Sequence, residues 1–424
     1  MQTIRQAIAL LQQNPLLSTI SILGTAFAIT MIMAIVITWQ TKYSDIEPEV
    51  NRSRCLYISK IHIQNKENKN WNTFGSCSPA FMKECVQPLE KVEACTSFTS
   101  AAVALLSMTD GTNRMKVDVV NTDPGFWNVF RMQFVAGRGF EEADWGGKVQ
   151  SIVISASTAR KLFGTTDAVG KIVLLNRDEA RVCGVVKDVS VTAKDAYAQV
   201  WNLYPRSRQD ATSVWSYSRD FTVAALVSSV EDMPAVKQEI EKRVKDVNAA
   251  LPEFLIDIME QPDGIVEHVN HVWANISPDL AMLYLQYFIA VLIILLVPSL
   301  NLCGLSNSRM QQRMGELGVR KAFGATRGIL IRQILNENLI LTLLGGIVGL
   351  GLSYLSVYGM RNWLFINGDN IGTSGDFNLS MSVLFSPVVF CLAFLFCLII
   401  NLLSAGVPAW IAARHTIVDS LNDK

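Results

Sequence analysis

The chain has 424 residues with 37 basic and 37 acidic side chains, so its formal net charge is zero. Half of its residues are hydrophobic and its mean hydropathy is +0.28. A disordered chain needs low hydrophobicity and high net charge, which excludes that class. Zero net charge also argues against nucleic acid as a partner, because nucleic-acid-binding proteins usually carry a basic excess.

Residues 1–15 precede the first apolar run. Ile4, Ile8 and Leu11 are spaced for one helical face, which predicts a cytoplasmic amphipathic helix on the membrane surface. The uncharged run at 16–38 is long enough to cross roughly 30 Å of hydrocarbon as a helix. A cleaved signal peptide would have an apolar region of only about 7–15 residues, so an uncleaved span is favoured.

Three further apolar runs predict three more transmembrane helices, at 280–303, 333–358 and 383–405, and Glu337 near the start of 333–358 is the only charged residue within these bounds. The loop at 304–332 contains one acid, Glu316, and these basic residues: Arg309, Arg313, Arg320, Lys321, Arg327 and Arg332. Basic loops stay in the cytoplasm, so both termini, including the tail at 406–424, are expected there. Residues 39–279 and the short loop at 359–382 then lie outside.

The outer region is expected to be a mixed α/β domain. Short β-branched runs predict strands at 55–58, 116–120, 151–154, 182–186 and 221–227. Helices are expected to start at Ser78-Pro79, running on through Phe81, Val86 and Leu89, at Ser155 (ending at Gly164) and at Met233-Pro234. Strand and helix patterns that alternate in this way favour a layered fold.

No sequence pattern predicts a catalytic, cofactor or metal site. The chain has no G-x-x-x-x-G-K-[ST] phosphate loop, and His268 and His271 are interpreted as a polar face of the helix entering the second span. Five cysteines lie outside the spans: Cys55, Cys77, Cys85, Cys95 and Cys183. A disulfide between Cys77 and Cys85 or Cys95 and a set of free thiols both remain open.

The predicted spans contain no ionisable residue apart from their ends, which argues against a polar conduit through them. Gly345 and Gly349 form a G-x-x-x-G pattern in the third span, where small residues allow two helices to approach closely. The partner helix could belong to the same chain or to a second copy.

The most specific pattern lies between the second and third spans, where Arg313 to Ala325 spells R-M-G-E-L-G-V-R-K-A-F-G-A. It resembles the cytoplasmic loop of the MacB/FtsX family of ABC transporter permeases, R-x-x-E-[IL]-G-[IV]-[RM]-[KR]-A-[LF]-G-A. P-A-W-I-A-A-R at 408–414 also resembles that family, whereas V-D-S-L at 418–421 replaces its frequent P-x-E-A-L. Outer segments resembling the MacB-type core lie at 123–130, 136–140, 159–164 and 184–188.

The resemblance implies a four-helix membrane permease with a large extracytoplasmic α/β domain, porter-like with an inserted subdomain at about 136–212. It implies a multi-pass protein of the bacterial inner membrane that is not an enzyme and binds no cofactor. ATP would be bound by a separate ABC ATPase subunit. Other implied partners are the lipid bilayer, a second permease copy or paralogue, a periplasmic adaptor and an outer-membrane channel.

The resemblance also implies that the cytoplasmic loop is a coupling helix that docks on the ATPase. The residues that match the family pattern there are Arg313, Glu316, Gly318, Arg320, Lys321, Gly324 and Ala325. The favoured function is a type VII, MacB-like exporter that uses mechanotransmission to move peptide, drug or lipid-linked cargo. The alternative is an FtsX-like or peptide-sensing permease that relays a signal.

Overall fold

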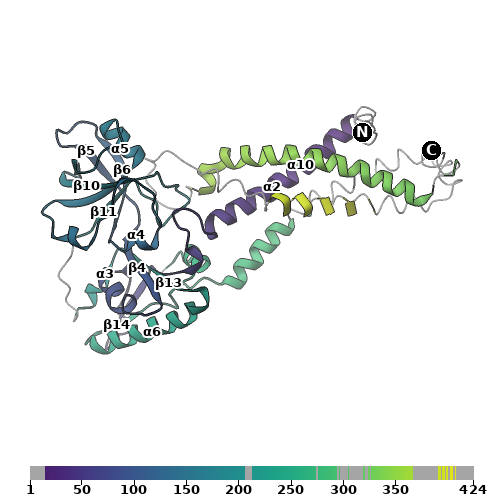
Figure 1. The fold of residues 1–424 in the computed structure, drawn as a ribbon. Coiled ribbons are helices and arrows are strands. Elements are labelled where there is room, and N and C mark those ends of the chain that lie inside the picture. The colour runs from purple at the N-terminus through teal and green to yellow at the C-terminus, as the bar shows by residue number, and fades with distance from the viewer. Residues whose placement is uncertain are drawn as a thin grey trace. The chain divides into compact units, whose positions relative to one another are not determined.

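The computed structural model describes residues 15–205, 213–273, 276–293 and 326–365, with residues 296, 304, 319 and 323–324 and several positions between 390 and 406. The chain forms two compact units (Figure 1). The helical unit comprises residues 1–39, 281–364 and 384–424, and the sheet unit comprises 40–280 and 365–383.

Two described helices are long and apolar enough to cross a membrane. They lie within α2 (Pro15–Tyr43) and α10 (Arg327–Phe365), where Ser18–Tyr43 and Asn338–Met360 have mean hydropathies of 2.5 and 1.9. A shorter apolar helix covers Leu280–Ile293. The predicted runs at 16–38 and 333–358 therefore fall on helices. Most of 294–303 and of the fourth run, 383–405, lies outside the described residues.

The first sheet of the sheet unit is antiparallel and has the order β1-β13-β3-β2-β14, with β4 also paired to β13 and β12 to β3. Its strands are β1 (Cys55–Ile58), β2 (Ile61–Asn65), β3 (Asn72–Cys77), β4 (Val92–Thr99), β12 (Ser218–Arg219), β13 (Phe221–Val227) and β14 (Phe254–Asp257). The long helix α6 (Met233–Ala250) packs Val236, Ile240 and Val244 into the core beneath this sheet.

The second sheet has the order β7-β10-β8-β11-β6-β5-β9, and β9 also pairs with β10. Six of its strands therefore form a closed ring, which leaves β7 as an attached edge. Its strands are β5 (Ala102–Met108), β6 (Met115–Thr122), β7 (Phe134–Gly137), β8 (Gln150–Ser155), β9 (Ile172–Leu175), β10 (Asp178–Val186) and β11 (Val200–Leu203). The sequence predicts an inserted subdomain at about 136–212. In the structure the same sheet also contains β5 and β6, which lie before residue 136.

Short helices and turns connect these strands. They are the single turns at Arg52–Arg54, Val214–Ser216 and Val230–Asp232, η3 (Glu142–Gly146), α3 (Pro79–Phe81), a π-helical turn (Met82–Val86), α4 (Phe126–Val129), α5 (Ala156–Phe163) and α7 (Ile265–Asn270). All five predicted strands are present, and so are the predicted helix starts. Ser78 accepts backbone N–H bonds from Ala80 and Phe81, and Gly164 ends α5 in the left-handed conformation. The helix predicted to run from Ser78 to Leu89 instead widens to the π-helical turn and ends at Val86.

The two sheets pack through a shared aromatic core that includes Phe126, Phe130, Phe140 and Trp201, all fully buried. Two glycines, Gly125 and Gly137, allow backbone segments to approach each other closely near this core. A side chain at Gly137 would approach the carbonyl oxygen of Cys183 to 2.3 Å, and one at Gly125 would approach that of Cys95 to 2.1 Å. Backbone contacts this close require glycine, which explains the positions of both residues in the outer motifs.

Candidate functional site

The predicted coupling loop is described only in part. Gly324 is exposed and has φ of +93°, a conformation that L side chains rarely adopt. The backbone N–H of Phe323 donates to the carbonyl oxygen of Val319 at 3.1 Å, and the Phe323 side chain is 88% exposed. The other predicted coupling residues lie outside the described residues: Arg313, Glu316, Gly318, Arg320, Lys321 and Ala325.

The structure places Gly345 and Gly349 against α2 of the same chain. A side chain at Gly345 would approach Cβ of Thr25 to 2.7 Å, and one at Gly349 would approach the carbonyl oxygen of Ala26 to 2.9 Å. The hydroxyl of Thr30 donates to the Gly349 carbonyl at 3.2 Å. Small residues therefore let α2 and α10 approach closely within the helical unit.

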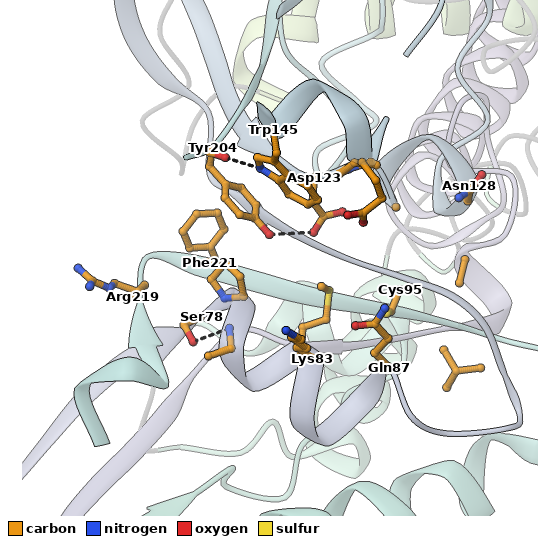
Figure 2. A pocket seen from close by; sticks show the side chains of 18 of the residues that line it. Ser78, Lys83, Gln87, Cys95, Asp123, Asn128, Trp145, Tyr204, Arg219 and Phe221 are labelled. Atoms are coloured by element: carbon orange, nitrogen blue, oxygen red, sulfur yellow. Dashed lines mark hydrogen bonds between the residues drawn. The ribbon is translucent and has the colours of Figure 1, made fainter. Parts of the chain in front are cut away.

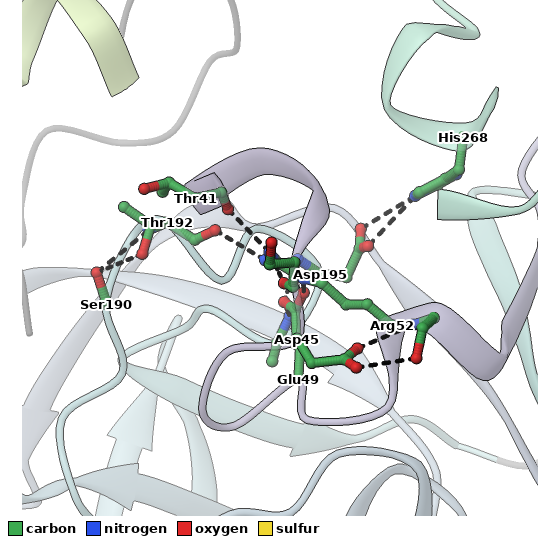
Figure 3. A network of polar contacts seen from close by, with 11 residues as sticks. Thr41, Asp45, Glu49, Arg52, Ser190, Thr192, Asp195 and His268 are labelled. Carbon is green, nitrogen blue, oxygen red and sulfur yellow. Dashed lines mark hydrogen bonds and ion pairs between the residues drawn. The ribbon is translucent and has the colours of Figure 1, made fainter. Parts of the chain in front are cut away.

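A buried guanidinium lies in the sheet unit just after the last turn of α2 (Figure 3). Arg52 is 3% exposed and donates to the carbonyl oxygens of Thr41 at 2.8 Å, Ser44 at 3.1 Å and Thr192 at 2.9 Å. Its Nε pairs with Glu49, which is also buried. We call Glu49, Arg52, Thr192 and Asp195 the Arg52 joint.

The two oxygens of the Glu49 carboxylate have different partners. Oε1 accepts the backbone N–H groups of Asp195 at 3.0 Å and Ala196 at 2.8 Å, while Oε2 pairs with Arg52. Burial raises the pKa of Glu49, and the charge of Arg52 opposes that rise. The loop at 190–196 is therefore held to the chain that follows α2 by hydrogen bonds between its backbone groups and the charged side chains of Glu49 and Arg52.

Asp195 extends these contacts to α7. Its carboxylate lies 3.3 Å from Nε2 of His268, whose ring stacks on Tyr57 with centroids 4.2 Å apart. Burial favours a higher pKa for Asp195, but His268 and nearby cations outweigh it and lower that pKa. His271 is buried with Nδ1 2.8 Å from Asp263. The prediction of a polar helix face was wrong for His271, which is buried and lies just after α7; each ring contacts a carboxylate through one nitrogen, while Nδ1 of His268 and Nε2 of His271 are buried without a hydrogen-bond partner among the described residues.

A cleft of about 1000 Å³ lies elsewhere in the sheet unit, lined by residues of both sheets (Figure 2). Trp145, Tyr204 and Phe221 form an aromatic wall, with ring centroids 6.0 Å and 5.0 Å apart along the series. Nε1 of Trp145 donates to the Tyr204 carbonyl at 2.8 Å, which fixes the wall. Lys83 and Arg219 also line the cleft and are exposed.

Asp123, which follows β6, also lines the cleft, and its carboxylate bonds to β4 of the other sheet. Asp123 accepts the hydroxyl of Thr96 at 2.9 Å, the backbone N–H and hydroxyl of Ser97 at 2.8 Å, and the hydroxyl of Tyr204 at 3.3 Å. Burial raises the pKa of Asp123, while these donors oppose the rise. Asp123 therefore ties the two sheets together.

Replacing Asp123 with alanine is expected to lower the free energy of unfolding of the sheet unit by about 3 kcal/mol, because it leaves buried donors of Ser97 and Thr96 without an acceptor. Asp123→Asn keeps one acceptor oxygen and is the matched control, with a smaller loss. Hydrogen exchange of β4 amides measures both effects. Equal stability of the two variants would show that these bonds contribute little.

The five outer cysteines are free thiols in this structure. Cys55, Cys77 and Cys85 are buried, and burial raises the pKa of Cys85 and of the partly buried Cys95 to about 12. Thiols with such pKa values carry little thiolate and react slowly. The sequence left open a disulfide from Cys77 or a set of free thiols, and the structure shows free thiols. Among the residues that the structure describes, no group of His, Cys, Asp and Glu could hold a metal ion.

Two family models match separate parts of the sequence. The MacB-like periplasmic core domain matches residues 18–243, more than half of the chain, and the FtsX-like permease C-terminal domain matches residues 288–417. The chain belongs to the MacB/FtsX family of ABC transporter permeases. This confirms the resemblance of the loop and outer motifs, and it indicates a membrane protein.

Relatives of this MacB/FtsX permease include an uncharacterized ABC transporter permease, YknZ, of Bacillus subtilis (strain 168). The two are 21% identical over 84% of this chain and 85% of YknZ. The macrolide export ATP-binding/permease protein MacB of Escherichia coli O6:K15:H31 (strain 536 / UPEC) is 23% identical over 97% of this chain but only 59% of MacB. This chain thus spans little more than half the length of that MacB.

Among solved structures, the periplasmic region of MacB from Actinobacillus actinomycetemcomitans is similar, with a TM-score of 0.33 and 16% identity over 47% of this chain and 88% of that chain. The extracellular domain of YknZ gives a TM-score of 0.35 and 17% identity over 47% of this chain and 99% of that chain.

Sequence reasoning missed the Arg52 joint. Glu49 and Arg52 are ordinary charged residues after a span, and Thr192 lies 140 residues from Arg52 in the sequence. Asp123 could have been found, since it opens one of the outer motifs.

Proposed function

We propose that this chain is the permease subunit of a type VII, MacB-like ABC transporter. A separate cytoplasmic ATPase would hydrolyse ATP, and the permease would transmit the resulting movement to the sheet unit outside the membrane. The observation that carries this proposal is the presence of a MacB-like core domain and an FtsX-like permease region in one chain. The spans at 16–38, 280–303, 333–358 and 383–405 would cross the inner membrane, with both termini in the cytoplasm.

The loop at 304–332 contains the proposed contact with the ATPase, in the segment 313–325. The exposed Phe323 beside the left-handed Gly324 supports this role, because an exposed aromatic side chain on a fixed turn can insert into a partner. Arg313, Glu316, Gly318, Arg320, Lys321 and Ala325 would complete the contact. Gly345 and Gly349 would keep α10, which follows this loop, packed on α2.

We assign the transporter to export from the periplasmic side, with a second permease copy or paralogue, an adaptor and an outer-membrane channel. Support comes from MacB, whose name describes macrolide export. Peptides, drugs and lipid-linked molecules are the cargo classes to screen. A deletion strain that exports normally but loses a signalling response would favour the regulatory alternative.

The purified chain alone is expected to hydrolyse no ATP, because its sequence has no phosphate loop. Turnover should appear when the partner ATPase is added, and the two proteins should co-purify. A phosphate-release assay on the permease, the ATPase and their complex makes this measurement. Turnover by permease free of ATPase, shown by mass spectrometry, would refute the subunit assignment.

A further inference from the structure

The last turn of α2 ends at Tyr43, where backbone carbonyl groups lie against Arg52. Such groups carry partial negative charge and need donors when they are buried. Arg52 supplies these donors, to Thr41 and Ser44, while a third N–H of the same guanidinium binds Thr192. One rigid planar group therefore links the chain just after the first predicted span to the loop at 190–196, which lies between β10 and β11 of the second sheet.

We propose that Arg52 is the positioning residue through which the end of α2 moves the sheet unit. This inference rests on the proposed function and names the residue that performs its transmission step. The guanidinium is buried and bonded on three sides, so α2 cannot shift along its axis without moving Thr192 or breaking charge-assisted bonds. Glu49 completes the contact by holding the neighbouring N–H groups of the same loop.

The loop at 190–196 also contacts the segment that precedes the second predicted span. Asp195 binds His268 on α7, and α7 lies shortly before the apolar helix Leu280–Ile293. The loop thus receives contacts from chain segments next to two predicted spans. The partly exposed pair Arg54–Glu93 in the same region has N and O 3.2 Å apart and side chains 26% and 46% exposed. It makes no contact with α2 among the bonds described.

The test uses the permease–ATPase complex in lipid nanodiscs and the double variant Glu49→Gln/Arg52→Met. The introduced glutamine keeps an acceptor oxygen for Asp195 and Ala196, and removal of both charges leaves no unpaired ion. The variant should therefore fold and retain ATP turnover. We expect the ATP-dependent change in hydrogen exchange of residues 190–203 to fall about tenfold, within the usual range of coupling effects. Arg54→Met is the matched control and should keep the wild-type change.

A purely structural role for Arg52 predicts another result. The folded double variant would then show the wild-type ATP-dependent change, and that outcome would overturn the inference while leaving the proposed function intact. If the wild-type complex itself shows no ATP-dependent change in the sheet unit, the proposed function fails and the inference fails with it. If the double variant retains ATP turnover but loses the ATP-dependent change in hydrogen exchange that the wild type shows, the result supports both the proposed function and the role of Arg52.

Discussion

Replacing Arg52 alone with methionine is expected to lower the free energy of unfolding of the sheet unit by about 3–5 kcal/mol, because the carboxylate of Glu49 stays buried without its cation. The carbonyls of Thr41, Ser44 and Thr192 also lose their hydrogen bonds from Arg52. Hydrogen exchange of β1 and β13 amides in the full-length chain measures this loss. The double variant Glu49→Gln/Arg52→Met should recover most of it, since it buries no unpaired charge.

The stability of Arg52→Met should also depend on pH. Burial already raises the pKa of Glu49 above its ordinary value of 4.5, and removal of the opposing Arg52 charge raises it further. The folded state then binds a proton that the unfolded state releases, so stability falls as pH rises above about 4.5. We expect Arg52→Met to be closer to wild type at pH 5 than at pH 8. Equal losses at both pH values, or an equal loss in Arg54→Met, would contradict this account.

Local signals in the sequence predicted a large part of the sheet unit. Ser78 and Ser155 are followed by helices because their side chains accept the first free N–H groups, and Gly164 ends α5 because it adopts positive φ without strain. Strands of β-branched residues that are buried on both faces, such as β8 and β13, stand out as continuous apolar runs.

Strands with weaker patterns could not be predicted from the sequence. Polar residues interrupt β3, β9 has only four residues, and β5 is an apolar run whose Val103 and Leu105 are exposed. The closure of the second sheet depends on β9 bridging β5 and β10, a pairing that no local pattern specifies. The Arg52 joint was hidden for the same reason, because its bonds join residues up to 147 positions apart.

Gly324→Val in the cytoplasmic loop is expected to reduce ATPase association, or ATP-dependent export, by an order of magnitude or more. Gly324 has φ of +93°, which is unfavourable for a β-branched residue. The variant should therefore change the backbone conformation next to the exposed Phe323. Glu316→Lys tests the same contact by charge, since a charge-assisted bond contributes roughly 1.5–3 kcal/mol. Co-purification with the ATPase and an export assay measure both variants.

The matched control for the turn is Gly328→Ala. Gly328 lies in the first turn of α10, an added side chain there meets nothing within 4 Å, and it does not have positive φ. Alanine favours a helix over glycine, so this variant should associate with the ATPase as the wild type does. If the loop serves only to orient the spans, Glu316→Lys adds positive charge to a basic loop and should be harmless. Wild-type association and export in both Gly324→Val and Glu316→Lys would therefore refute the coupling role, whereas selective loss with intact membrane insertion supports it.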